Sequence, residues 1–386
     1  MVVGNALGME NNPAGRLIRK ENMGTPIKVA ALVRYGTQSA TSRIRFEQYA
    51  PFFAQEDIRM ELHPLLNNPY LTAFYNGHGH FLPHLASAYL RRARALPGIC
   101  RHADVLWIEK ELFPFLPAWL EAMLLRNNTS WVLDYDDATF HSYDSVRNPI
   151  LRHLLKDKIG SLMRRAAGVT AGNEYLADYA RVAAARRVEV LPSVIDLAHY
   201  SVRQARENVP VVIGWIGSPS TSRYLEEIQP TLADVCKGDR ARLVVMGTQH
   251  GFSLKGVPVE TRNWALEQEV STLLSFDIGI MPLEDSAWGR GKCGYKLIQY
   301  MACALPVVGS SIGVNRTIIK HGKNGFTASS AKEWKTALTT LCDDWVLRKQ
   351  MGLAGRKSVE ENYCVQKTWP LAVKVLREAA TGNGQT

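Results

Sequence analysis

Two lysines stand close together in a glycine-rich stretch in the second half of the sequence. The stretch reads Gly291-Lys292-Cys293-Gly294-Tyr295-Lys296, and Gln299 follows one turn later on the same face of a predicted helix. Glycines let a backbone approach an anion closely, and two lysines neutralise a diphosphate without a metal ion. The alternative is that Lys292 and Lys296 form the solvated end of an ordinary surface helix.

A second candidate anion site follows the apolar run 211–217, which predicts a strand. Gly217 and Ser218 precede a row of hydroxyl residues, and Arg223 stands at the start of a predicted helix. Bare N–H groups, hydroxyls, a positive helix end and a guanidinium suit a phosphate. Serine and threonine also cap helices in proteins that bind no phosphate, so an ordinary strand-to-helix turn is the competing interpretation.

Two more features would line the same site. The loop 34–45 carries Gly36 and several hydroxyls, and we expect it to close over a diphosphate with Arg43 or Arg45 as counter-charge. The alternative is a serine-rich loop with a helix cap at Ser42. Trp264 follows a predicted strand end and would edge a base pocket, unless it is a buried core residue.

These residues are positioned by short apolar runs that alternate with amphipathic stretches from Ile27 onward. The pattern predicts parallel strands covered by helices. The predicted strands are 27–33, 103–108, 131–135, 168–171 and 188–191, then 211–217, 243–247, 276–281 and 306–309. The predicted helices are 44–53, 151–166, 224–236, 267–274 and 295–304, followed by a helical tail from 332 that Trp369-Pro370 interrupts before a last helix, 371–380.

The length of 386 residues exceeds the size at which one hydrophobic core stops growing, and predicts two domains. A polar stretch, 201–208, places the boundary between them. The predicted organisation is a poorly ordered extension (1–25), two Rossmann-like α/β domains (26–205 and 206–368) with a ligand crevice at the carboxyl ends of their strands, and a C-terminal helix and tail (369–386) that crosses back to the first domain.

Bulk composition excludes several classes of protein. The net charge of +10 is spread along the chain and suits an anionic ligand or surface, but no zinc spacing, helix-turn-helix or RNA-binding signature accompanies it, so we expect no nucleic acid partner. The six cysteines lack C-x-x-C spacing and a secretory leader, which predicts reduced thiols and a cytoplasmic location. No apolar run approaches 18 residues, so no membrane span is predicted.

The segment that follows Lys296 carries a family resemblance. Residues 296–310, then Gly313 to Arg316 and His321 to Phe326, resemble the donor-site segment of glycosyltransferase family 4, the retaining GT-B group, and the similarity is strong from about Phe276 to Tyr363. The resemblance implies a GT-B fold, an N-terminal acceptor domain and a C-terminal nucleotide-sugar domain. It also implies that the diphosphate is contacted by Lys292, Gly294, Tyr295 and Lys296, and the ribose by Gln299.

One departure from the family concerns two glutamates that it usually carries eight positions apart. The matching positions here are Gly291 and Gln299, and neither is acidic. The Gln299 amide still offers hydrogen bonds to ribose hydroxyls, whereas a carboxylate for the donor sugar would have to come from Glu284 or Asp285. The alternatives are that the loss of both glutamates reflects a different donor sugar or a loss of activity.

Three carboxylates follow the predicted strand 131–135. Asp134-Tyr135-Asp136 matches the short D-x-D motif that binds a metal in GT-A transferases, but the two-domain pattern argues against that class. We expect Asp136, Asp137 and His141 at the acceptor side of the crevice, with His141 as the residue that best resembles the family's acceptor-domain histidine; a structural histidine is the alternative.

The sequence therefore predicts transfer of a sugar from a nucleotide-diphosphate sugar to a hydroxyl of a glycan or lipid-linked acceptor. The resemblance implies retention of configuration and no metal or other cofactor, with Lys292, Lys296 and Arg223 stabilising the diphosphate. Basic stretches at Arg91 to Arg94 and 152–165 allow peripheral contact with the inner face of a membrane. The alternatives are a sugar-nucleotide epimerase and a non-catalytic nucleotide-sugar-binding protein.

Overall fold

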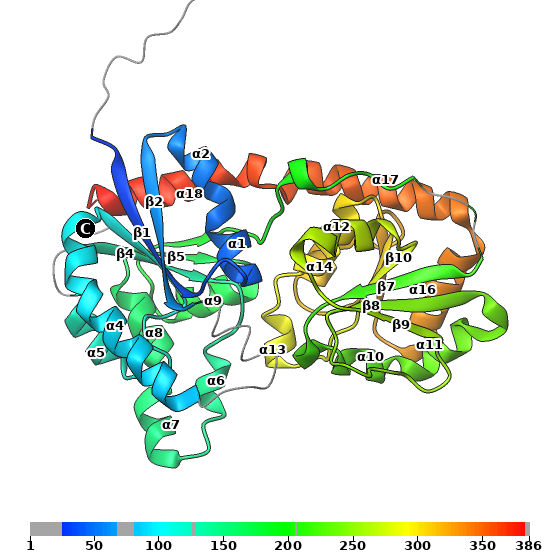
Figure 1. Ribbon diagram of the computed structural model, residues 1–386, viewed down its shortest axis with the longest axis horizontal. Coiled ribbons are helices and arrows are strands. Elements are labelled where there is room, and N and C mark those ends of the chain that lie inside the picture. Colours follow the sequence, from blue (N-terminus) through cyan, green and yellow to red (C-terminus); the bar gives the residue numbers. More distant parts are fainter. Residues whose placement is uncertain (1–24, 68–80, 126–128, 205–206, 208, 383–386) are drawn as a thin grey trace, which may run out of the picture.

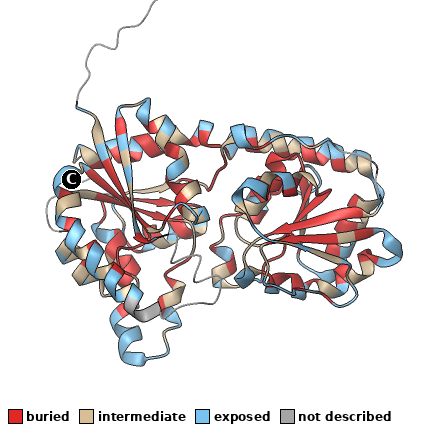
Figure 2. Ribbon diagram, in the orientation of Figure 1, coloured by how far each residue is buried: buried red, intermediate tan, exposed pale blue. Residues whose placement is uncertain are grey.

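The protein consists of two α/β domains placed side by side (Figure 1). The structure, a computed structural model, describes residues 25–67, 81–125, 129–204, 207 and 209–382. The predicted extension before Thr25 and the predicted boundary at 205–206 lie outside the described residues. Buried residues concentrate on the strands at the centre of each domain, and exposed residues on the outer faces of the helices (Figure 2).

The N-terminal domain is built on a six-stranded parallel sheet. Its strands, in spatial order, are β2 (Ile58–Leu66), β1 (Ile27–Tyr35), β3 (Val105–Glu109), β4 (Ser130–Tyr135), β5 (Gly168–Ala171) and β6 (Val188–Val190). The helices of this domain are α1 (Ala40–Arg45), α2 (Ala50–Ala54), α4 (Phe81–His102), α5 (Ala118–Leu124), α6 (His141–Asp144), α7 (Pro149–Leu155), α8 (Lys158–Arg165) and α9 (Glu174–Val182).

The C-terminal domain contains a second six-stranded parallel sheet. Its strands, in spatial order, are β12 (Gly325–Ala328), β11 (Val307–Ser310), β10 (Ile278–Met281), β7 (Val211–Ile216), β8 (Ala241–Met246) and β9 (Val259–Arg262). Its helices are α10 (Arg223–Glu227), α11 (Gln229–Val235), α12 (Leu266–Leu274), α13 (Ala287–Arg290), α14 (Tyr295–Ala302), α15 (Asn315–Ile318), α16 (Ala331–Asp343) and α17 (Trp345–Asn362), and short 3-10 turns complete both domains.

Three strands, β2, β9 and β12, are absent from the predicted ranges, although a strand end was expected before Trp264, and all three lie at sheet edges. Edge strands are covered less completely than central strands, so they lack the continuous apolar run that marks a buried parallel strand. In β2 buried and exposed residues are mixed, and Pro64 is tolerated because an edge strand pairs on one side only.

Several predicted helices are broken in the structure, and prolines explain two of the breaks. The predicted helix 44–53 is divided into α1, a 3-10 turn and α2, because Pro51 has no N–H with which to continue the first helix. The predicted helix 224–236 restarts at α11 in the same way, with Pro230 in its first turn. The predicted helix 151–166 is divided into α7 and α8.

The chain returns to the N-terminal domain through α18 (Val365–Ala380), as predicted, but without the predicted interruption. The helix runs continuously through Pro370, and Val365, Val373 and Leu376 are buried in the core beside β1 and β3. Each buried aliphatic side chain contributes about 1.5–3 kcal/mol, which together outweighs the roughly 3 kcal/mol cost of a helical proline. The helices α17 and α18 span both domains along one side of the molecule (Figure 1).

Candidate active site

The carboxyl ends of the two sheets supply the residues at the domain interface. In the C-terminal sheet the strand order reverses between β7 and β10, and in the N-terminal sheet between β1 and β3. Ligands of open α/β sheets bind at such reversal points, outside the carboxyl ends of the strands. Gly217 follows β7, Gly36 follows β1, and Lys110 follows β3.

Lys296 lies against the end of β7. Its ammonium is 4.2 Å from the centre of the Trp215 ring and 3.4 Å from the Thr221 hydroxyl. A Cβ atom at Gly217 would lie 2.3 Å from the rigid Trp215 ring as well as 2.6 Å from this ammonium, so a side chain there would displace both. Burial, with a smaller contribution from the nearby charge of Lys292, lowers the pKa of Lys296 to about 7. Among the described residues no carboxylate forms an ion pair with Lys296.

The hydroxyls after Gly217 are engaged locally. Ser218 and Thr221 form a reciprocal cap of the short turn Pro219–Thr221, which is the ordinary capping alternative stated for this segment. Arg223 is exposed, and its guanidinium lies 5.1 Å from the ring of Tyr224. In this structure Arg223 contacts Tyr224, and its predicted contact with a diphosphate stays a prediction.

The helix α14 starts at Gly294, whose φ of +70° is in the left-handed region. A Cβ atom at Gly294 would lie 2.3 Å from Ile318, so this helix start requires a glycine. One residue later, the Tyr295 hydroxyl lies 3.5 Å from the Tyr200 hydroxyl, and burial raises the pKa of Tyr295 well above its usual range. This geometry fixes the position of Lys296 in the first turn.

Gln299 is bound to a carboxylate that the sequence did not predict. Its amide nitrogen donates to Glu269 Oε1 at 2.6 Å and to the Tyr200 hydroxyl at 3.1 Å. The second oxygen of Glu269 accepts a hydrogen bond from the Trp264 indole at 2.9 Å. Glu269 is 8 % exposed and lies on α12, so a carboxylate is present beside position 299 although it comes from another helix.

Close approach of the domains leaves no room for a side chain at Gly291, where the family resemblance would place a glutamate. A Cβ atom there would lie 2.4 Å from the Ala138 side chain in the N-terminal domain. Asp285, which was predicted as a donor ligand, is bound instead to Arg290 at 2.8 Å and is exposed; the arginine lowers the pKa of this carboxyl. Asp285 therefore secures its own loop in this structure.

On the N-terminal side Lys110 is the central cation, and the sequence did not predict it. Its backbone is left-handed (φ +62°), a conformation that costs energy for a residue with a side chain and tends to occur at functional sites. Its ammonium is 2.7 Å from Asp136 Oδ1, while Thr41 donates to Asp136 Oδ2 at 2.8 Å. Burial would raise the pKa of Asp136, but Lys110 holds it at about 2.

Arg45, the alternative to Arg43 as counter-charge for a diphosphate, is instead a structural residue. Its side chain is fully buried and donates to both carboxylate oxygens of Asp134, at 2.9 and 2.6 Å, and to the Leu191 carbonyl at 2.7 Å. The N–H groups of a guanidinium that are used in this way are not available to a ligand. Asp134 likewise serves this ion pair and not a D-x-D metal site.

The two domains meet through direct polar contacts. Lys292 Nζ is 2.8 Å from Asp137 Oδ1, and the Cys293 thiol donates to the Asp136 carbonyl at 3.0 Å. Asn173, after β5, donates to the carbonyls of Gly291 at 3.1 Å and Lys292 at 3.0 Å. Burial raises the pKa of Cys293, so this thiol packs as a neutral group.

A second contact between the domains joins two residues predicted separately. The Arg43 guanidinium lies 5.2 Å from the centre of the Trp264 ring. Arg43 also donates to the carbonyls of Thr37 and Gln38, at 3.0 and 2.9 Å, and so shapes the loop that starts at the buried Gly36. This loop therefore reaches the C-terminal domain.

His141 is held on α6 by two partners. One ring nitrogen is 2.8 Å from Asp144 and the other is 2.8 Å from the Tyr175 hydroxyl. A substrate would have to displace one of them to bond the ring. The acceptor-side role of His141 stays a prediction.

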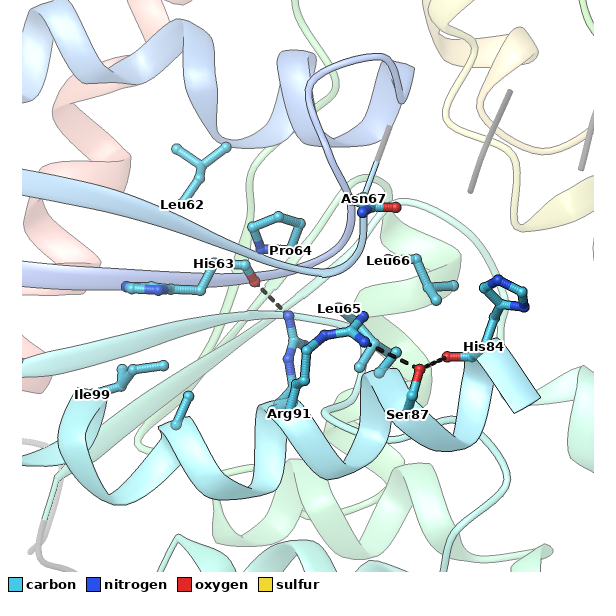
Figure 3. A pocket seen from close by; sticks show the side chains of 13 residues that line it. Leu62, His63, Pro64, Leu65, Leu66, Asn67, His84, Ser87, Arg91 and Ile99 are labelled. Atoms are coloured by element: carbon cyan, nitrogen blue, oxygen red, sulfur yellow. Dashed lines mark hydrogen bonds between the residues drawn. The ribbon is translucent and has the colours of Figure 1, made fainter. Parts of the chain in front are cut away.

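A groove of about 410 Å³ lies between the edge strand β2 and α4 (Figure 3). Its wall is apolar at Leu65 and Ala88, and polar at Ser87 and Arg91, whose side chains are 3.1 Å apart. Arg92 ties the helix to the sheet by donating to the Val33 carbonyl. The groove belongs to the N-terminal domain alone.

Groups that would hold a metal ion are not found among the described residues. In the same part of the chain no helix combines the length and the apolar character needed to cross a membrane. All six cysteines are free thiols.

Two Rossmann-like domains with facing strand ends, joined by a helix that returns to the first domain, define the GT-B fold of glycosyltransferases. Sucrose-phosphate synthase from Thermosynechococcus elongatus is similar over 92 % of this chain and 100 % of its own, at 12 % identity and a TM-score of 0.67. Anabaena HepE, in complex with UDP and glucose, is similar over 91 % of this chain and 100 % of its own, at 14 % identity and a TM-score of 0.63. The lipopolysaccharide outer core galactosyltransferase WaaB is similar over 92 % of this chain and 100 % of its own, at 12 % identity and a TM-score of 0.60.

The C-terminal domain is also recognised from its sequence. Residues 210–344 match the family model described as glycosyl transferases group 1. Comparison with curated protein sequences gave no significant match. At identities of 12–14 % the solved structures establish the fold, and the chemistry has to be argued from this chain's own residues.

Proposed function

We propose that this protein transfers a glycosyl unit from a nucleotide-diphosphate sugar to a hydroxyl of a glycan or lipid-linked acceptor. The observation that carries the proposal is the pair of lysines, Lys292 and Lys296, at the reversal point of the C-terminal sheet. Neither is neutralised from within its own domain, among the described residues. A diphosphate would supply the missing negative charge, and Glu269 and Trp264 beside Gln299 would offer polar and aromatic contacts to a nucleoside.

We further propose that transfer proceeds with retention and without a metal, the two lysines supplying the positive charge that a metal ion would otherwise provide. When the bond between the anomeric carbon and the diphosphate oxygen breaks, its electrons stay on the diphosphate, and two ammonium groups stabilise that charge. The acceptor oxygen bonds to the anomeric carbon, and its proton passes to a diphosphate oxygen, so no separate strong base is required. Domain contacts at the site would exclude water and limit hydrolysis of the donor.

The test is a thermal-shift panel of UDP-, GDP-, ADP- and dTDP-sugars, followed by transfer assays with the donor that binds. A ligand at 100 times its dissociation constant adds about 2.7 kcal/mol to the free energy of unfolding. We expect one base to be preferred, turnover to be unchanged by a chelator, and the product to keep the donor's anomeric configuration by NMR. Binding without turnover would instead favour a non-catalytic protein, and an epimer formed without acceptor would favour an epimerase.

We also propose that the N-terminal domain docks on an anionic membrane surface from the cytoplasmic side. Large apolar side chains stand exposed on its outer helices, which lie at the lower left of Figure 1. They are Leu90 on α4, Trp119 and Met123 on α5, and Ile150 and Leu154 on α7. Exposed arginines accompany them, Arg91 and Arg94 on α4 and Arg152 on α7. Apolar side chains beside cations suit the boundary between headgroups and acyl chains.

The docking proposal is tested by co-sedimentation with vesicles of phosphatidylcholine, with and without phosphatidylglycerol. We expect binding only when the anionic lipid is present, and a several-fold loss in the variant Trp119→Ser/Ile150→Ser. Val182→Ser, on α9, removes a comparably exposed apolar side chain from another element and serves as the control. Equal binding by both variants would contradict the proposed surface.

A further inference from the structure

Asp137 lies between two lysines that belong to different domains. Its Oδ1 is 2.8 Å from the ammonium of Lys292, and its Oδ2 is 4.0 Å from the ammonium of Lys110. The side chains of Asp137 and Lys292 are 27 % and 21 % exposed. The cross-domain pair therefore lies at the rim of the interface, where water and ligands have access.

A pair of this kind is readily exchanged. Partly exposed ion pairs shift an equilibrium by no more than about fivefold, because water and salt screen them. A diphosphate carries more charge than one carboxylate, and it can contact Lys292 and Lys296 together. A donor that binds as proposed therefore competes with Asp137 for Lys292.

Asp137 is not left without a cation when the donor takes Lys292. Lys110 stays beside it, held in place by Asp136 and by its own left-handed backbone. Oδ1 of Asp137 is then a negatively charged hydrogen-bond acceptor at the domain interface. A sugar substrate that receives the glycosyl unit can donate hydrogen bonds to it from its hydroxyls. A sugar has several hydroxyls, so one can bind Asp137 while another reacts.

We propose that Asp137 exchanges Lys292 for a hydroxyl of a sugar acceptor when the donor binds. The same carboxylate holds the donor-binding lysine in the donor-free protein and orients the acceptor in the loaded protein. The hydroxyl bound to Asp137 is not the one that reacts, so the proton balance of the transfer is unchanged. This inference rests on the proposed function and adds a binding order, donor before acceptor.

The test measures two constants in Asp137→Asn. Dissociation constants for UDP, GDP, ADP and dTDP are measured by calorimetry, and acceptor KM is measured with a panel of octyl glycosides. We expect the nucleoside diphosphate that binds best to bind three- to fivefold more tightly to the variant, because Lys292 is no longer occupied. The acceptor KM should rise about tenfold, because an amide accepts a hydroxyl hydrogen bond less strongly than a carboxylate.

Two further variants separate exchange from a structural role. Asp137→Glu keeps the carboxylate and should return both constants towards the wild-type values. Asp234→Asn is the matched control, since Asp234 also pairs with two lysines, Lys237 and Lys335, but lies on α11 away from the interface; it should change neither constant.

The outcomes are distinct. Donor affinity that is unchanged or weaker in Asp137→Asn overturns the exchange while leaving the proposed function intact. A wild-type protein that glycosylates none of the glycosides overturns the sugar-acceptor assignment. A wild-type protein that binds none of the four nucleotides overturns the proposed function itself.

Discussion

Buried cations on the N-terminal side of the interface are paired within their own domain, whereas the C-terminal side presents lysines on a glycine-rich backbone. Arg45 is bound to Asp134, and Lys110 to Asp136. Lys292, in contrast, forms its ion pair with Asp137 of the other domain. The N-terminal side is thus organised before any ligand arrives, whereas no described carboxylate of the C-terminal domain forms an ion pair with Lys292 or Lys296. We expect a variant of Arg45 to affect folding, and a variant of Lys296 to affect ligand binding.

The largest effect should come from breaking an internal pair of the N-terminal side. Arg45→Met leaves the Asp134 carboxylate buried without its cation, and we expect the free energy of unfolding to fall by about 3–5 kcal/mol in denaturant titrations. Arg181→Ala, on an exposed pair with Glu174 and Asp178, is the control and should change it by less than about 0.5 kcal/mol. Similar values for the two variants would remove the distinction between the two sides.

The hydrogen-bonded pair Gln299 and Glu269 allows the role of Glu269 in the C-terminal domain to be tested. Gln299→Glu restores the residue expected from the family resemblance, yet it sets two buried carboxylates against each other. We expect it to destabilise the protein by about 3 kcal/mol and to weaken donor binding. The swap Gln299→Glu/Glu269→Gln leaves one carboxylate and should recover most of both losses. A stable, more active single variant would contradict the role given to Glu269.

A variant of Lys296 should separate binding from stability. Lys296→Met removes a charge-assisted contact to the diphosphate, so donor affinity should fall about 10–100-fold by calorimetry. The free energy of unfolding at pH 7 should stay the same or rise, because the variant no longer buries an ammonium group. Loss of stability together with loss of binding would show that Lys296 belongs with the structural charges.

The smallest predicted effect concerns pH. The pKa of Lys296 is lowered to about 7 in the donor-free protein, and a bound diphosphate should raise it. Donor binding then takes up a proton above pH 7, so the apparent dissociation constant of a nucleotide sugar should increase with pH, by up to about tenfold per unit. Lys296→Met should show a flat profile between pH 7 and 9. A steep profile in that variant would assign the titration to another group.

The sequence predicts the centre of each sheet better than its edges. The runs around Val105, Val132, Ile213 and Val307 are strongly apolar because helices cover those strands on both faces. The edge strands β2, β9 and β12 carry no such signal. The continuity of α18 through Pro370 could not be predicted from local sequence, because it depends on packing against the N-terminal domain.

The candidate site was predictable only where local sequence carries the signal. The glycines around Lys292 and the family resemblance identify that segment. The contact between Lys292 and Asp137 joins positions 155 residues apart, and the local sequence of neither segment predicts it. Lys110 was missed because its left-handed backbone leaves no mark on the sequence, and Glu269 because it stands among other polar residues of an amphipathic helix.

The return of α18 also determines the order in which the molecule can be completed during synthesis. The core beneath β1 and β3 contains Val365, Val373 and Leu376, which the ribosome adds only after the whole C-terminal domain. The first domain to leave the ribosome is therefore the last to finish folding. Until then its sheet exposes an apolar face, and this is the stage at which chaperones would be needed.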